Sequence, residues 1–205
     1  MGVLRKIFGP GKDEIWKQLC SELGADFVQG TFSRQSKVQV HVKEWTVTLD
    51  TFVMSTGKSH IPFTRMRAPY VNPDGFRFKV YRSGVFTEIG KTFGMQDIEV
   101  GHSEFDRAYV IQGNHEEKVH LLFGNAEIRR LIEAQPSIRF EVKDDEGWFG
   151  TAFPEGVDEL YFQVVPGVIK DIPRLKLLYE LFAETLNHLC HIGSAYEDDP
   201  KLAVK

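Results

Sequence analysis

Hydrophobic residues recur at helical spacing in three parts of the chain. Ile15, Leu19 and Leu23 lie four residues apart and Gly24 follows them, so we expect a helix over 11–24. Similar spacing predicts a helix from 114 to about 134, with a break at Gly124-Asn125. The longest apolar stripe follows Pro173 and predicts a helix over 173–192; it consists of Leu175, Leu178, Phe182, Leu186 and Leu189.

Elsewhere the hydrophobic period is two, which is typical of half-buried antiparallel strands. Val38, Val40 and Val42 alternate with polar residues, and the alternation resumes over 45–51. The sequence Asn72-Pro73-Asp74-Gly75 predicts a tight turn. The remaining expected elements are strands near 61–68, 76–82, 97–101, 107–112, 138–143, 148–152 and 157–165, and a short helix over 84–94.

This order of elements predicts one α+β domain over 1–193, with an antiparallel sheet packed on one side by three main helices. Each half, 1–94 and 95–193, offers helix and strand elements, which suggests two related halves, although no motif repeats between them. The polar tail 194–205 is expected to be mobile.

The formal net charge of −4 conceals an uneven distribution. Residues 30–92 hold 10 basic and 4 acidic residues, whereas residues 93–205 hold 11 basic and 21 acidic residues. The two parts either match each other internally or leave a basic binding surface. Only Cys20 and Cys190 are present, and no signal peptide or membrane span is evident, so we expect a soluble, cytoplasmic protein.

Pairs of basic residues at even spacing place like charges on one face of a strand. The candidate basic surface consists of Lys37, Lys43, Arg65, Arg67, Arg77 and Lys79. A sheet that binds RNA also needs exposed aromatic residues among its cations, but Phe76 and Phe78 lie on the opposite side from Arg77. The pattern therefore favours an acidic protein surface, or a second copy of the chain, over a nucleic acid as the partner.

One constellation has metal-ligand spacing. Glu184, His188 and His191 lie four and three residues apart, so they line one edge of the last predicted helix. The same residues also form the polar side opposite the leucine stripe, and histidines suit a helix C-terminus without any metal. We favour this second interpretation and expect no metal and no cofactor.

The common catalytic and nucleotide-binding motifs are missing from the sequence. It contains no glycine-rich phosphate loop, and Gly101-His102-Ser103-Glu104-Phe105 lacks the second glycine of a nucleophile elbow. Aromatic residues are abundant, with 16 Phe and 6 Tyr. Plain core packing accounts for them, and a pocket for a small apolar ligand is the alternative.

The segment Glu104-Phe105-Asp106-Arg107-Ala108-Tyr109-Val110-Ile111-Gln112-Gly113-Asn114, followed by a helix that reaches Arg129-Arg130-Leu131-Ile132, resembles a stretch of uncharacterised bacterial domains of unknown function. The resemblance covers about 95–192. It implies a structural role for Phe105, as a core anchor of a strand, and for Asp106, as the cap of a turn. It implies no catalytic residue.

Together these observations predict a non-enzymatic, soluble binding or interaction protein of that bacterial family. The alternatives are a carrier of a small apolar ligand and a metal-dependent enzyme that uses the last helix.

Overall fold

The computed structural model of the protein describes residues 10–32, 34–55, 57, 60–84, 95–144, 152–164 and 167–202. The helices are α2 (Lys12–Leu23), α3 (Ser103–Ala108), α4 (Glu116–Gly124), α5 (Ala126–Glu133) and α6 (Ile172–His191). The strands are β1 (Asp26–Val28), β2 (Lys37–Val42), β3 (Trp45–Ser55), β4 (His60–Val71), β5 (Phe78–Arg82), β6 (Gln96–Asp97), β7 (Tyr109–Gly113), β8 (Arg139–Lys143) and β9 (Val157–Gln163).

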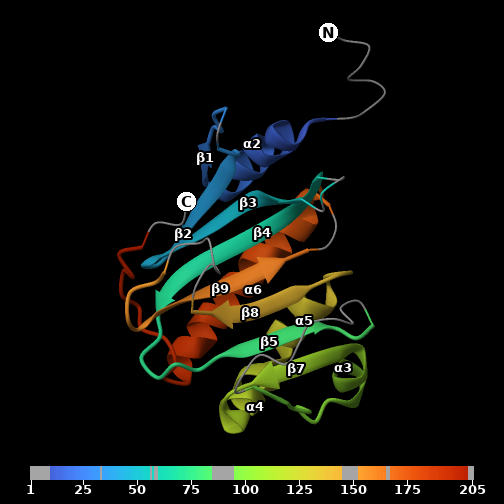
Figure 1. Ribbon diagram of the computed structural model, residues 1–205, viewed down its shortest axis with the longest axis vertical. Helices are drawn as coiled ribbons and strands as arrows, with labels where there is room; N and C mark the ends of the chain where they lie inside the picture. Colours follow the sequence, from blue (N-terminus) through green and yellow to red (C-terminus); the bar gives the residue numbers. More distant parts are fainter. Residues whose placement is uncertain are drawn as a thin grey trace.

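All of these strands belong to one antiparallel sheet, in the order β1-β2-β3-β4-β9-β8-β5-β7-β6 (Figure 1). The strand β4 pairs with β9 from Arg65 to Val71, so the sheet runs without a break from the first half of the chain into the second. Figure 1 shows α6 crossing behind the central strands, and α2, α4 and α5 all contact it. The predicted α+β class, the antiparallel sheet and the long C-terminal helix are confirmed. A repeat relationship between the halves stays a prediction.

The structure agrees with the predicted end of the first helix and the predicted start of the last. Gly24 ends α2 with a φ of 65°, a conformation that costs glycine little, and its N–H donates to the Cys20 carbonyl. The side chain of Asp171 accepts the Arg174 N–H and caps α6, with Pro173 in the first turn. Cys20 of α2 is buried.

Aromatic side chains fill the space between the sheet and the helices. The Phe78 ring centroid lies 5.4 Å from that of Phe123 and 5.6 Å from that of Phe140. Phe140 lies 5.5 Å from Phe182 of α6. All four side chains are buried, so these four phenylalanines serve core packing rather than a ligand cavity.

The segment around 103–108 differs from the prediction. Strands were expected near 97–101 and 107–112, but the structure has the short β6, then α3, then β7 from Tyr109. The carboxylate of Asp106 accepts the N–H groups of Val100 and His102, which closes the turn before α3. Phe105 is buried from a helix rather than from a strand. A six-residue helix with one buried side chain has too little periodicity to distinguish it from a strand.

The start of α4 is a second correction. The helix was expected to begin at 114, but it begins at Glu116 with His115 as the cap, whose Nδ1 accepts the Lys118 N–H. Asn114 instead accepts the Arg77 N–H and donates to the Gly75 carbonyl, so it binds the turn between β4 and β5. The predicted break at Gly124-Asn125 is confirmed, because Asn125 caps α5 there.

Two expected elements, the helix over 84–94 and the strand over 148–152, fall almost wholly outside the described residues. The tail expected to be mobile begins with packed residues, since Ser194 and Ala195 are buried and the Tyr196 N–H donates to the Val71 carbonyl. The mobility of the rest of the tail stays a prediction.

Candidate functional site

The central strands of the sheet are buried on both faces. In β4 all residues from Met66 to Tyr70 are buried, and in β9 the same holds from Val157 to Phe162. Met66 and Ala68 contact the core on the side of α6. Because side chains alternate along a strand, Arg65 and Arg67 project from the opposite side.

This opposite side carries ionisable and polar groups on five adjoining strands, β3, β4, β9, β8 and β5. We call it the polar face; it consists of Asp50, Arg65, Arg67, Lys79, Arg139, Glu141, Lys143, Glu159, Tyr161 and Gln163.

The strand register aligns these residues in rows across the sheet. One row spans eight strands and is polar at every position: Gln39, Thr48, Arg67, Tyr161, Glu141, Lys79, Gln112 and Asp97. A neighbouring row contains Asp50, Arg65, Gln163 and Arg139. Side chains directly opposite each other on neighbouring strands are close enough to interact, so each row is a chain of potential contacts.

Asp50 organises the β3–β4 end of the polar face. It accepts two hydrogen bonds from Arg65, from Nε and Nη2, each 2.8 Å long. It also accepts a 2.7 Å hydrogen bond from Nη2 of Arg67, whose side chain is 0% exposed. A two-pronged guanidinium–carboxylate contact is directional, so it fixes the arginine as well as neutralising part of its charge.

Glu141 organises the other end, where three cations surround it. Nη2 of Arg139 lies 2.9 Å from Oε1, and the ammonium groups of Lys79 and Lys143 each lie 3.6 Å from a carboxylate oxygen. Burial lowers the pKa of both lysines, and Glu141 acts in the opposite direction. One buried carboxylate thus offsets only part of the charge around it.

Tyr161 separates the two ends of the face. Its hydroxyl donates to Oε1 of Gln163 over 2.9 Å, and burial raises the pKa of the phenol to about 12. The phenol is therefore a neutral donor at physiological pH. The ring contributes its π face to the Lys143 ammonium.

The polar face has a net positive charge. Five cations belong to it, Arg65, Arg67, Lys79, Arg139 and Lys143, against the three carboxylates Asp50, Glu141 and Glu159. Arg139 and Lys143 keep side-chain exposures of 28% and 26%, and Arg65 keeps 17%. The face therefore presents a cationic, partly accessible surface that suits negatively charged groups.

The six predicted basic residues separate into two groups. Arg65, Arg67 and Lys79 come together on the polar face. Lys43 instead contacts Glu197, and Arg77 binds Asp144 and Asp158 at 2.8 and 3.3 Å. Lys37 lies half-buried at the start of β2. Part of the charge asymmetry is therefore matched internally. Basic residues of the first half form ion pairs with acidic residues of the second half: Lys43 with Glu197, Arg77 with Asp144 and Asp158, and Lys79 with Glu141.

Arg139 and Lys143 were not among the basic residues predicted from the sequence, and the acidic residues Asp50 and Glu141 were not predicted either. Arg139, Glu141 and Lys143 alternate with buried residues of β8, so their common face was visible in the sequence. Their position opposite Lys79 and Tyr161 depends on β8 lying between β5 and β9, which strand periodicity does not reveal.

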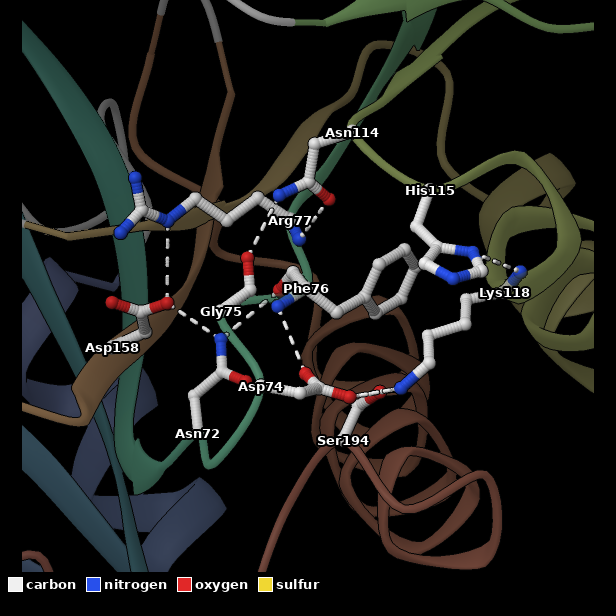
Figure 2. Close-up of polar contacts among 10 residues, drawn as sticks. All are labelled: Asn72, Asp74, Gly75, Phe76, Arg77, Asn114, His115, Lys118, Asp158 and Ser194. Atoms are coloured by element: carbon white, nitrogen blue, oxygen red, sulfur yellow. Dashed lines mark hydrogen bonds and ion pairs between the residues drawn. The ribbon is translucent and has the colours of Figure 1, made fainter.

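A second polar cluster surrounds the turn between β4 and β5 (Figure 2). We call it the turn cluster; its side-chain members are Asn72, Asp74, Arg77, Asn114, Lys118, Asp158 and Ser194. Asn72 donates to Asp158 over 2.6 Å, and Asp158 also accepts from Nε of Arg77 at 3.3 Å.

In the same cluster, Lys118 donates to Ser194 over 2.8 Å and contacts Asp74, and the Ser194 hydroxyl donates to Asp74 over 3.1 Å. Ser194 is fully buried, so its hydroxyl does not meet solvent. These bonds join β4, β9, α4 and the end of α6, as Figure 2 shows. We assign the turn cluster a structural role.

Two of the three candidate metal ligands, Glu184 and His188, bind protein groups. Nδ2 of Asn125 donates to Glu184 over 2.8 Å and lies 3.4 Å from Nδ1 of His188. Nε2 of His188 lies 3.0 Å from the Leu121 carbonyl oxygen. In the described part of the chain, no three His, Cys, Asp or Glu side chains are grouped as a metal site would require. The arrangement joins α6 to the α4–α5 corner.

Comparisons with known proteins add no relatives. No family model matches the chain, and no curated protein and no solved structure matches it. The resemblance to uncharacterised bacterial domains therefore stays an expectation. Within the described ranges, no helix combines the length and the apolar character needed to span a bilayer.

Proposed function

We propose that this protein is a non-enzymatic binding protein that holds an acidic segment of a partner protein against the polar face of its sheet. The excess of cations over carboxylates on that face carries the proposal. Carboxylate side chains suit the face because guanidinium groups bind them in directional pairs. The cytoplasmic setting and the bacterial family, expected from the sequence, belong to this proposal.

The row formed by Arg65, Gln163 and Arg139 supports an extended acidic segment as the ligand. These residues lie opposite one another on β4, β9 and β8. Neighbouring strands are about 4.8 Å apart, so the two guanidinium-bearing strands are separated by about 10 Å. That separation suits two carboxylates of one peptide better than a single small anion.

The enzyme alternative has less support. His188 and Glu184 are engaged by Asn125 and the Leu121 carbonyl, which accounts for both residues without a metal. On the polar face, the perturbed pKa values of Lys79 and Lys143 have a direct cause in burial beside Glu141.

Fluorescence polarisation with a labelled ten-residue glutamate peptide tests the proposal. We expect binding at about 50 mM salt and clear weakening at about 300 mM, because screening reduces contacts between exposed charges. Arg139→Glu should weaken binding about tenfold or more. Arg130→Glu is the matched control, because Arg130 is an exposed arginine of α5 that pairs with Glu127. It should change affinity less than about twofold.

Three outcomes would count against the proposal. The first is no binding of the glutamate peptide at about 50 mM salt. The second is equal weakening by both charge reversals, which would indicate attraction to net charge alone. The third is tighter binding of a single-stranded oligonucleotide of similar length, which would assign the face to nucleic acid. Arg139→Gln, which introduces no new charge, keeps the test valid if Arg139→Glu fails to fold.

A further inference from the structure

The C-terminal segment passes from the helix side of the sheet to the polar side. Buried Ser194 is fixed to Lys118 and Asp74, and the Tyr196 N–H then donates to the Val71 carbonyl at the end of β4 over 3.1 Å. We call residues 196–202 the strap. In Figure 1 the chain after α6 passes the ends of β4 and β9 and returns towards β2.

The strap then lies over residues of β2, β3 and β4 that adjoin the β3–β4 end of the polar face. Glu197 contacts Lys43 in the turn between β2 and β3. A cavity of about 300 Å³ separates the strap from the sheet; it is lined by Gln39, Thr46, Thr48, Pro69, Asp199, Lys201 and Leu202. Thr48 is opposite Arg67 in the register, and Pro69 is opposite Glu159. The strap is thus a direct neighbour of the charged rows.

The strap has the chemistry of the proposed partner. Glu197, Asp198 and Asp199 are three consecutive acidic residues, and all three are exposed. Residues 196–199 are exposed, and the strap is held at a backbone bridge from Tyr196 to Val71, at the Lys43 contact and along the lining of the open cavity. A segment with few buried contacts opens locally at a low free energy.

We infer that the strap is a built-in acidic competitor that lies beside the β3–β4 end of the polar face and is displaced when an acidic partner binds. This inference rests on the proposed function. Only molecules whose strap is open can bind the partner. The apparent affinity is therefore the intrinsic affinity multiplied by the fraction of molecules whose strap is open. It also favours partners that carry more acidic residues than the strap.

Charge neutralisation in the full chain tests the inference. The strap variant is Glu197→Gln, Asp198→Asn and Asp199→Asn. The control is Glu104→Gln, Glu116→Gln and Glu117→Gln, which removes three exposed carboxylates from α3 and α4. Both variants change the net charge equally, so general attraction to the labelled glutamate peptide rises equally in both. The strap variant should bind the peptide about fivefold tighter than the control.

Hydrogen exchange at the Tyr196 amide provides a second readout. This amide donates to Val71, so it should exchange slowly in the free protein and faster when the glutamate peptide saturates the wild type. Equal affinities of the two variants, or unchanged Tyr196 exchange, would overturn the competitor role while leaving peptide binding intact. No binding by the wild type and both variants would overturn the proposed function together with this inference.

Discussion

The Lys143 ammonium lies 3.3 Å from the centroid of the Tyr161 ring on the neighbouring strand. The register places Lys143 opposite Glu159 and Tyr161 opposite Glu141, so the pair is diagonal between β8 and β9. A cation over an aromatic face is attracted by the ring quadrupole, and more strongly where water is partly excluded. This contact and Glu141 together hold a lysine whose pKa is lowered by burial.

A double-mutant cycle with Lys143→Met and Tyr161→Leu should reveal this contact. We expect a coupling energy of about 1 kcal/mol in urea unfolding. Tyr161→Phe keeps the ring but loses the hydrogen bond to Gln163, so the coupling to Lys143 should persist in that background. Two results would contradict the role assigned to the ring. One is a coupling energy near zero in the cycle with Tyr161→Leu, and the other is loss of the coupling to Lys143 in the Tyr161→Phe background.

Asp74 should stabilise the fold in a pH-dependent way. Burial alone would raise the pKa of Asp74, but hydrogen bonds from Lys118, the Phe76 N–H and Ser194 outweigh it, and the pKa falls below 3.8. The stabilisation is therefore present above about pH 4 and is lost as the pH falls through the folded-state pKa. Asp74→Asn should cost about 1–2 kcal/mol at pH 7 and less near pH 3. Urea unfolding at both pH values measures this, and exposed Glu104→Gln should show no comparable difference.

Asn125 should act as a structural joint between three helices. Its Oδ1 accepts the Glu127 and Ile128 N–H groups, and its Nδ2 donates to Glu184 of α6. Asn125→Ala should cost about 2 kcal/mol, whereas Asn125→Ser keeps a cap and should cost about half as much. Thermal unfolding with and without EDTA should give the same midpoint. A lower thermal unfolding midpoint in EDTA would instead indicate a bound metal at Glu184 and His188.

Gly113 should not tolerate a side chain. A Cβ at this position of β7 would collide with Cγ2 of Val119, which belongs to α4 and is fully buried. Gly113→Ala should therefore destabilise the protein by about 1–3 kcal/mol. Gly124→Ala is the matched comparison, because a Cβ there meets open space at the end of a helix, and it should be neutral or slightly stabilising. Thermal midpoints of the two variants should differ clearly; equal midpoints would contradict the close packing of β7 on α4.

The sequence allowed the main helices and most strands to be predicted because their signals are local. Three signals each depend on neighbours within a few positions: the spacing of apolar residues in α2 and α6, Gly24 and Pro173 at the helix ends, and the turn after Asn72. The helix α3 was not predicted because its local signal is weak. It consists of one buried side chain, Phe105, and of the Asp106 carboxylate, which accepts hydrogen bonds from two preceding N–H groups.

The candidate site shows the same division between local and distant information. Alternation within each strand established that Arg65 shares a face with Arg67. It also predicted a basic surface that would include Lys43 and Arg77, but these pair with Glu197, Asp144 and Asp158 from distant parts of the chain. Strand order decided which cations gather, because β9 and β8 lie between β4 and β5 and add Arg139 and Lys143.

The sequence by itself thus determined the main helices, most of the strands, the α+β class and the uneven charge along the chain. The tertiary structure decided which charges meet, because a charge pair forms wherever folding brings two side chains within a few ångströms, however far apart they are in the chain. Lys79 and Glu141 illustrate this: each reads as a polar position of a strand, and only the pairing of β5 with β8 makes them a buried ion pair.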